Sequence, residues 1–208
     1  GKITFEGAVP TPKKISTSSD PGCKNSKLVS EDVVVSDGGL ENVILYVSGG
    51  DSVGKSFPTP REEVLLSQSA CHYAPHALTL QVGQRLKIIN NDETAHNVHG
   101  WSEINPPFNE SQPSKGAVTS KTFTREEVMF TVRCDVHSWM SAFIGVFNSP
   151  QAAVSTRGGA YEMKLIAGTH TITAGHEKLG KKEQRVTIAE NGSTELNFTF
   201  KADDKTAD

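Results

Sequence analysis

Short runs in which hydrophobic and polar residues alternate recur along most of the chain. Such alternation is typical of strands that bury one face, and turn-forming segments such as SDGG, SGGD and TRGG separate the runs. Only REEVLLSQ (61–68) and TREEV (124–128) favour short helical turns. The pattern therefore predicts an all-β fold of packed sheets. The predicted strands are residues 2–7, 41–47, 76–82, 84–90, 128–134, 160–165, 169–174, 184–189 and 194–200.

Composition changes at two points, near residue 60 after the proline-flanked SFPTPRE segment and again at NSP, residues 148–150. The segment between these points contains most of the unusual chemistry. We therefore expect a central domain at residues 61–149, flanked by strand-rich segments at 1–60 and 150–203. The polar residues 204–208 are expected to form a disordered tail.

Overall composition excludes several classes of partner. The chain has 208 residues and a formal net charge of -3 with neutral histidines, so no basic surface indicates nucleic-acid binding. No apolar run is long enough to cross a bilayer. The chain begins directly in the strand-like GKITFEG, so we expect any export signal to have been removed already.

The short segment CDVHSWM, residues 134–140, contains three soft or borderline metal donors. A blue-copper site needs two imidazole nitrogens, one thiolate and usually a weak axial thioether. Cys134 would supply the thiolate, His137 one imidazole and Met140 the thioether. The second imidazole must come from another part of the chain.

Period-two alternation selects that second imidazole within NNDETAHNVHG, residues 90–100. On the strand that ends at Cys134 alternate residues are apolar, so the cysteine should point toward the core. His96 shares a face with Val98, whereas His99 points the other way. We therefore expect the imidazole of His96 to meet the sulfur of Cys134 at one end of a sandwich.

Residues 78–147 resemble the cupredoxins, the blue-copper proteins of the amicyanin and plastocyanin type. The likeness rests on HNVH at 96–99, the C-x2-H-x2-M loop, the VGQ-x-L-x-I-x-N-x-D strand and the closing AFIGVF strand, although Ala95 replaces a proline of many members. It implies a Greek-key β-sandwich in which the backbone N–H of Asn97 hydrogen-bonds the thiolate. It also implies one copper ion, Cu(I) or Cu(II), with a defined set of ligands. These are His96, Cys134, His137 and Met140.

Such a site would transfer single electrons and leave no coordination position for a substrate. We therefore expect an electron carrier with redox-protein partners, not an enzyme. A copper storage or delivery protein with the same ligands is one alternative, and a metal-free adhesion or scaffold module is another. A nucleophilic cysteine would leave His96 and Met140 unexplained, and structural zinc has no use for a thioether.

The resemblance further implies that His137 lies near the surface within a modest apolar patch suited to a short-lived docking partner. Trp139, Phe143 and Phe108 are the candidates for this patch. Ordinary packing beneath the loop is the alternative role of Trp139.

The remaining cysteines and histidines lead to further expectations. If Cys134 binds metal, Cys23 and Cys71 remain as a pair, which predicts a disulfide in a periplasmic or extracellular protein and two buried thiols in a reducing cytosol. The alternative is a second metal site. Its donors would come from Cys71, His72, His76 and His99. The two C-terminal histidines, His170 and His176, are expected on the surface, and no role is assigned to them.

The flanking segments resemble the carboxypeptidase regulatory-like (transthyretin-like) β-sandwich. The likeness rests on GKITFEGAVP, LENVILYV, the TRGGAYEMKLIAG turn region and the two last strand runs, with Gly159, Tyr161 and Gly168 at the turn positions and His170 in place of the usual aromatic residue. It implies that the central domain is inserted into a smaller sandwich formed by both flanks, an arrangement that exposed loops tolerate.

Overall fold

The computed structural model describes residues 1–205 and consists of two compact units, each built from two β-sheets. The central unit contains residues 12–31 and 58–148, and the flanking unit contains residues 1–11, 32–57 and those from 149 onward. The fold is all-β, as the sequence predicts. Both segments expected to form helical turns contribute to strands instead, because pairing with neighbouring strands overrides their weak helical preference.

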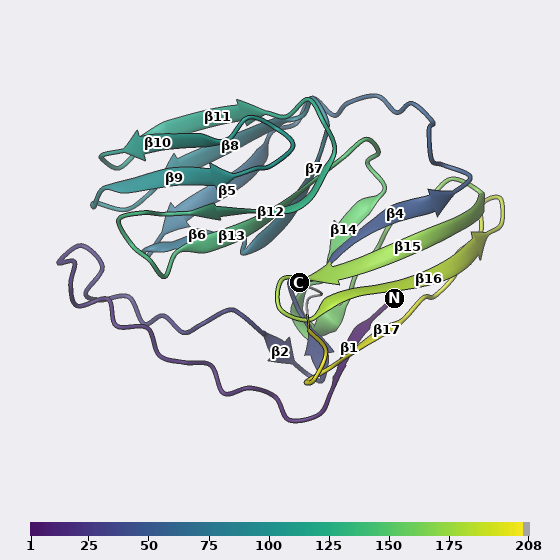
Figure 1. Ribbon diagram of the computed structural model, residues 1–208, viewed down its shortest axis with the longest axis horizontal. Coiled ribbons are helices and arrows are strands. Elements are labelled where there is room, and N and C mark those ends of the chain that lie inside the picture. The colour runs from purple at the N-terminus through teal and green to yellow at the C-terminus, as the bar shows by residue number, and fades with distance from the viewer. Residues whose placement is uncertain (206–208) are drawn as a thin grey trace. The chain divides into compact units, whose positions relative to one another are not determined.

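The central unit is a sandwich of a five-stranded and a four-stranded sheet (Figure 1). The five-stranded sheet has the order β10-β9-β12-β13-β7 and the four-stranded sheet the order β11-β8-β5-β6. Two parallel pairs, β13 with β7 and β5 with β8, join strands that are not consecutive in the chain. The strand bounds are β5 Val64–Ser69, β6 His72–Ala74, β7 Ala77–Gln81, β8 Arg85–Asn90, β9 His96–Trp101, β10 Phe108–Gln112, β11 Val118–Thr122, β12 Glu127–Arg133 and β13 Ser141–Phe147.

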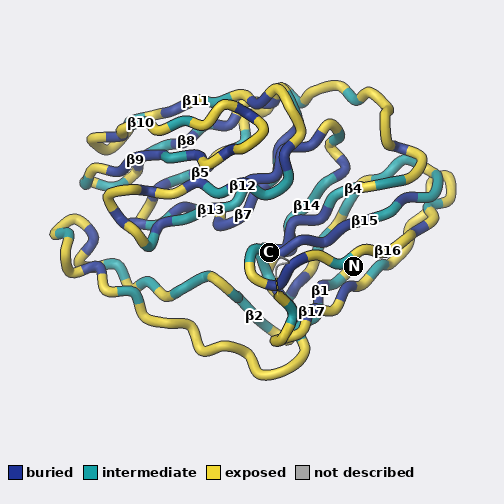
Figure 2. Tube along the Cα trace, viewed as in Figure 1, coloured by how far each residue is buried: buried dark blue, intermediate teal, exposed yellow. Residues whose placement is uncertain are grey.

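One apolar core lies between the two sheets of the central unit. Buried positions recur along β8 (Figure 2). Leu86, Ile88 and Asn90 are buried, whereas Lys87 and Ile89 between them are half-buried. The core extends to the end that holds Cys134 and Met140, which are 2% and 1% exposed. The side chains predicted to bind metal therefore lie at a dry end of the sandwich.

A β-bulge in β12 interrupts the alternation that the sequence predicts for this strand. The register with β13 shifts between Glu127 and Phe130, and Met129 has a φ of 56°. The alternation predicts that Val128 is buried together with Phe130 and Val132. Because of the bulge, Val128 is half-buried and Glu127 is buried in its place. Its carboxylate accepts hydrogen bonds from the 102–105 loop, with the backbone N–H of Glu103 at 2.7 Å.

Residues 12–31, which we call the arm, belong to the central unit although the composition boundary near residue 60 assigned them to the flank. The predicted disulfide is present, because Cys23 and Cys71 are joined by an S–S bond of 2.02 Å. The arm contains little regular structure of its own, with one isolated bridge between Lys14 and Val29. The disulfide and side-chain contacts therefore fasten this segment to the central unit.

The flanking unit also contains two four-stranded sheets, of order β17-β1-β3-β2 and β14-β4-β15-β16. Segments distant in sequence meet in it, because β1 pairs in parallel with β17 and β4 pairs with β15. A separate core that includes Ile3, Leu45 and Phe198 fills this unit. The bounds are β1 Ile3–Glu6, β2 Val35–Ser36, β3 Gly39–Leu40, β4 Ile44–Gly50, β14 Ala152–Val154, β15 Gly168–His176, β16 Gly180–Ile188 and β17 Phe198–Lys201, with a short 3-10 helix at Arg157–Gly159.

Two expectations for the flanking unit are wrong. His170 and His176 are buried, not on the surface, since they lie on the inward side of β15, and the ring of His170 hydrogen-bonds Ser52 and the backbone oxygen of Ile166. Residues 160–165 make only an isolated bridge at Ala160 instead of a strand.

Of the expected tail, Asp204 is ion-paired with Lys182 at 2.7 Å, and residues 206–208 lie outside the described residues. Within the described residues, no helix is long and apolar enough to span a bilayer.

Candidate metal centre

Strand register brings the first candidate ligands together. Strands β9 and β12 are antiparallel, with Arg133 opposite His99 and Val132 opposite Gly100. Continued by one residue, this register sets Cys134 opposite Val98. His96 lies two residues from Val98 on the same face of β9, so it is a diagonal neighbour of Cys134. Position 100 favours glycine, because a Cβ atom there would lie 2.3 Å from the Phe108 ring.

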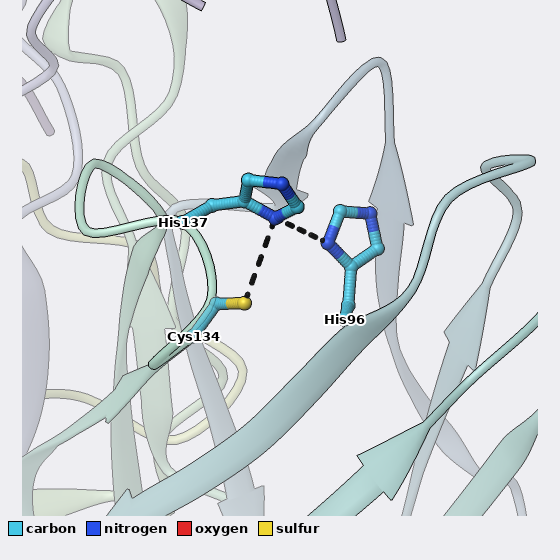
Figure 3. Close-up of side chains that lie close together, drawn as sticks. All are labelled: His96, Cys134 and His137. Atoms are coloured by element: carbon cyan, nitrogen blue, oxygen red, sulfur yellow. Dashed lines mark hydrogen bonds between the residues drawn. The ribbon is translucent and has the colours of Figure 1, made fainter. Parts of the chain in front are cut away.

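Three donor side chains converge at this end of the sandwich (Figure 3). The Nδ1 atoms of His96 and His137 are 3.0 Å apart, and Nδ1 of His137 is 3.8 Å from Sγ of Cys134. One donor atom from each of the three residues lies within 4.8 Å of the other two. All three side chains are buried, and their exposed fractions are 1%, 2% and 2% for His96, His137 and Cys134.

The loop after Cys134 closes tightly on itself. The backbone N–H of Met140 donates to the oxygen of His137 at 2.9 Å, and the N–H of Cys134 donates to the oxygen of Met140 at 3.2 Å. These two bonds return the chain to the start of the loop, so the residue with the thioether lies next to the residue with the thiol. Met140 is 1% exposed.

Each imidazole is held from behind by a carboxylate. Nε2 of His96 is 2.9 Å from Oδ2 of Asp92, and Nε2 of His137 is 2.9 Å from Oδ2 of Asp20 in the arm. Burial lowers the pKa of His96, although the bond to Asp92 opposes this effect. The hydrogen bond with His137 lowers the pKa of Asp20. Because a carboxylate oxygen accepts, both Nε2 atoms are assigned as N–H donors to these carboxylates.

This assignment leaves the two Nδ1 atoms facing each other as acceptors. A neutral imidazole has one N–H, so a ring that donates through Nε2 presents a lone pair at Nδ1. Two lone pairs 3.0 Å apart in a buried site repel each other unless a proton or a cation lies between them. The buried Cys134 sulfur lies on the same side of His137, which makes the arrangement suitable for a cation.

Burial of His137 contradicts the expectation that it lies near the surface. The arm covers its outer edge, where Asp20 accepts the Nε2 hydrogen bond and Sγ of Cys23 lies 3.7 Å from the same nitrogen. The ring of Trp139 lies 5.0 Å from the ring of His137, measured between centroids. Sequence reasoning did not single out either carboxylate, and only the four-residue spacing of Asp92 from His96 could have indicated one of them.

Asn97 joins β9 to the cysteine loop through its side chain. Its amide oxygen accepts the backbone N–H of Asp135 at 2.5 Å, and its amide nitrogen donates to the Asp135 carboxylate at 3.0 Å. The predicted bond from the Asn97 backbone N–H to the thiolate stays a prediction. The buried Tyr73 adds a further connection, because its hydroxyl donates to the backbone oxygen of Asn97 at 2.6 Å. Burial raises the pKa of Tyr73 well above its usual value.

The residues proposed for a docking patch are less exposed than the sequence suggested. Trp139 and Phe108 are half-buried and pack against the central core, and the indole N–H of Trp139 donates to the backbone oxygen of Cys71 at 3.0 Å. Phe143 is half-buried, with its ring 5.4 Å from that of His76. Large exposed apolar side chains that sequence reasoning missed include Trp101 and Val136, which are 56% and 58% exposed.

The second candidate metal site is dispersed. Cys71 is in the disulfide, and the donors near its sulfur are Asp92 and His96. His99 is at a different place, paired with Asp135 at 3.0 Å. Among the described residues, His72, His76 and His99 join no cluster of three donor side chains.

No protein-family model and no curated protein matches this chain. Parts of the chain are similar to solved structures of copper proteins. A purple cupredoxin from Nitrosopumilus maritimus is 20% identical with a TM-score of 0.35, and the likeness covers 40% of this chain and 98% of that one. Amicyanin from Paracoccus versutus is 19% identical with a TM-score of 0.37, over 49% of this chain and 96% of that one.

A third similar structure is a copper-containing nitrite reductase from Thermus scotoductus SA-01. It is 20% identical with a TM-score of 0.36, and the likeness covers 48% of this chain but 25% of the enzyme. These structural neighbours are cupredoxins or contain copper, and none of the likenesses assigns a ligand to a residue of this chain.

Proposed function

We propose that the chain binds one copper ion through His96, Cys134 and His137, with Met140 as a weak fourth ligand, and carries single electrons between redox proteins. The observation that carries the proposal is that the Nδ1 atoms of His96 and His137 face each other, 3.0 Å apart, beside the buried thiol of Cys134. Carboxylates occupy the other nitrogen of each ring. The donors that remain for a cation are two imidazole nitrogens and one sulfur.

Nδ1 of His137 lies 3.0 Å from Nδ1 of His96 and 3.8 Å from Sγ of Cys134, and both separations are compatible with a single ion. Typical bonds from a borderline-soft metal to imidazole nitrogen and thiolate sulfur are about 2.1 and about 2.3 Å, so donors of one ion lie no more than about 4.4 Å apart. The 3.8 Å between Nδ1 of His137 and Sγ of Cys134 satisfies this limit. Two imidazoles, one thiolate and a nearby methionine are the donor set of a blue-copper centre rather than of structural zinc.

Bound copper would supply a one-electron couple between Cu(I) and Cu(II). The protein contributes a rigid, dry set of donors, because the backbone bonds between His137, Met140 and Cys134 fix the loop. Rigid donors leave little to rearrange when the charge changes, so we assign electron transfer rather than catalysis. Burial of every candidate ligand also slows metal exchange, which disfavours the storage or delivery alternative.

The disulfide supports a location outside the reducing cytoplasm, because such bonds persist in oxidising compartments. We therefore propose a periplasmic or extracellular carrier. The flanking unit, with its own core, is proposed as a structural module of the transthyretin-like type.

Addition of Cu(II) to the apoprotein tests the copper proposal. We expect one equivalent to produce an intense visible thiolate-to-copper absorption. Cys134→Ser and His96→Ala should abolish this absorption. His99→Ala is the matched control, because His99 lies on the same strand but pairs with Asp135 at 3.0 Å, and this variant should keep the absorption. Absence of the band in the wild type, or its survival in Cys134→Ser, would overturn the proposal.

A further inference from the structure

The two carboxylates behind the histidines form a symmetrical arrangement that the ligand set alone does not require. Asp92 contacts Nε2 of His96 and Asp20 contacts Nε2 of His137, each at 2.9 Å. Asp92 comes from the turn between β8 and β9, close to its histidine in sequence. Asp20 comes from the arm, which is 117 residues away from His137.

Asp20 is held in a built environment. Its Oδ2 accepts a hydrogen bond from the hydroxyl of Thr94 at 2.9 Å, and its Oδ1 accepts the backbone N–H of Gly22 at 2.6 Å. A Cβ atom on Gly22 would lie 2.6 Å from the Cβ of Thr94, so the arm approaches this turn as closely as glycine allows. The carboxylate therefore has a fixed position relative to His137.

The disulfide connects the two carboxylates. Asp20 lies three residues before Cys23, and the Asp92 carboxylate accepts the backbone N–H groups of Ala70 and Cys71 at 2.6 and 2.9 Å. The Cys23–Cys71 bond therefore joins the segment that carries Asp20 to the turn whose backbone N–H groups hold Asp92. The donors Asp20, Cys23 and His137 lie within 4.8 Å of one another, as do Cys71, Asp92 and His96.

We propose that Asp20 and Asp92 are positioning residues of the copper site, which fix both imidazoles with Nδ1 toward Cys134 and stabilise the oxidised ion. This inference rests on the proposed function. A carboxylate bonded to the outer N–H makes an imidazole a stronger donor and places negative charge near the metal. Both effects favour Cu(II) over Cu(I), so these residues lower the reduction potential.

The expected magnitude follows from known effects of such partners. Loss of a group that orients a ligand typically weakens metal binding about 10- to 100-fold. If Asp20→Asn weakens Cu(II) binding about tenfold more than Cu(I) binding, the potential rises by about 59 mV, which is the tenfold equivalent for one electron. Asp92→Asn should shift the potential in the same direction.

Redox titration of the copper-loaded wild type, Asp20→Asn, Asp92→Asn and Glu31→Gln tests this inference. Glu31→Gln is the matched control, because it removes one negative charge from the same arm at a residue that lies near His76 instead of the ligands. We expect both asparagine variants to raise the potential and the control to leave it unchanged. Asp20→Glu should restore most of the wild-type value. Equal potentials in Asp20→Asn and Glu31→Gln would overturn the inference.

The ring tautomers of the apoprotein separate this inference from the copper proposal. Nitrogen-15 NMR of the wild-type histidines should show the proton on Nε2 of His96 and His137, and Asp20→Asn should perturb that signal for His137 only. If copper does not bind but these tautomers are found, the proposed function fails, whereas the orientation of the two rings by Asp20 and Asp92 is upheld. A proton on Nδ1 of His137 in the wild type would overturn the inference whether or not copper binds.

Discussion

Removal of the disulfide should cost the central unit several kcal/mol, because the bond closes a long loop. Cys23 and Cys71 are 48 residues apart in sequence. In the chain-entropy model, cross-linking a loop of that length removes about 14 cal/mol/K from the unfolded state, which is about 4 kcal/mol at 25 °C. Cys23→Ala/Cys71→Ala should lower the free energy of unfolding of the central unit by about that amount.

Tryptophan fluorescence during urea unfolding measures this loss selectively. The chain has two tryptophans, Trp101 and Trp139, and both belong to the central unit. The midpoint should fall in the double variant and in the wild type treated with a strong dithiol or phosphine reductant, by similar amounts. Reduction of the wild type introduces no cavity, so agreement between the two perturbations assigns the loss to the cross-link itself.

Two results would refute this reasoning. A loss below about 1 kcal/mol would mean that the arm restrains the unfolded chain far less than the loop length implies. A loss in the double variant that reduction of the wild type does not reproduce would assign the effect to cavities at two fully buried side chains. In either case the disulfide would not be the interaction that holds the arm against His137.

Two further predictions concern the stability of the central unit. Burial raises the pKa of Glu127, but the hydrogen bonds from the 102–105 loop outweigh this effect and lower it from 4.5 to about 2. Glu127→Gln should therefore cost about 3 kcal/mol at neutral pH, and this difference from the wild type should be complete above pH 4.5 and vanish as the pH falls toward 2. Urea midpoints of both proteins from pH 7 to pH 2 measure it, and a difference independent of pH would contradict the assignment. Gly100→Ala should cost about 1–3 kcal/mol because its Cβ would displace the Phe108 ring, and an unchanged urea midpoint would show that the ring moves freely.

Local patterns predicted the all-β class and placed His96 and Cys134 on inward faces, because strand alternation is a local property. The bulge in β12 was not predictable from alternation, since it depends on an extra residue accommodated opposite β13. It moved Val128 out of phase and buried Glu127. Burial of His170 was missed for a related reason: its ring is satisfied by Ser52, which is 118 residues away in sequence.

The surroundings of His137 are where the structure differs most from what the sequence predicted. Its burial depends on Asp20, and nothing in the local sequence of either residue indicates the other. The disulfide was predicted because Cys23 and Cys71 remain as a pair once Cys134 is assigned to the metal. That count predicts which cysteines pair, but not that the bond holds Asp20 near His137. Long-range contacts made by an irregular segment have no periodic signal, so only the folded chain reveals that the arm belongs to the site.

The irregularity of the arm also explains why a cross-link is required there. A segment with one isolated bridge and mostly exposed side chains gains little from burial, and ordering each backbone residue costs about 1–2 kcal/mol. A carboxylate on such a segment would spend much of its time away from His137. The Cys23–Cys71 bond places Asp20 three residues from a fixed point, and the bond from Thr94 then selects one orientation of the carboxylate. The disulfide thus keeps the Asp20 carboxylate close to the imidazole of His137, although neither of its sulfur atoms is a proposed metal ligand.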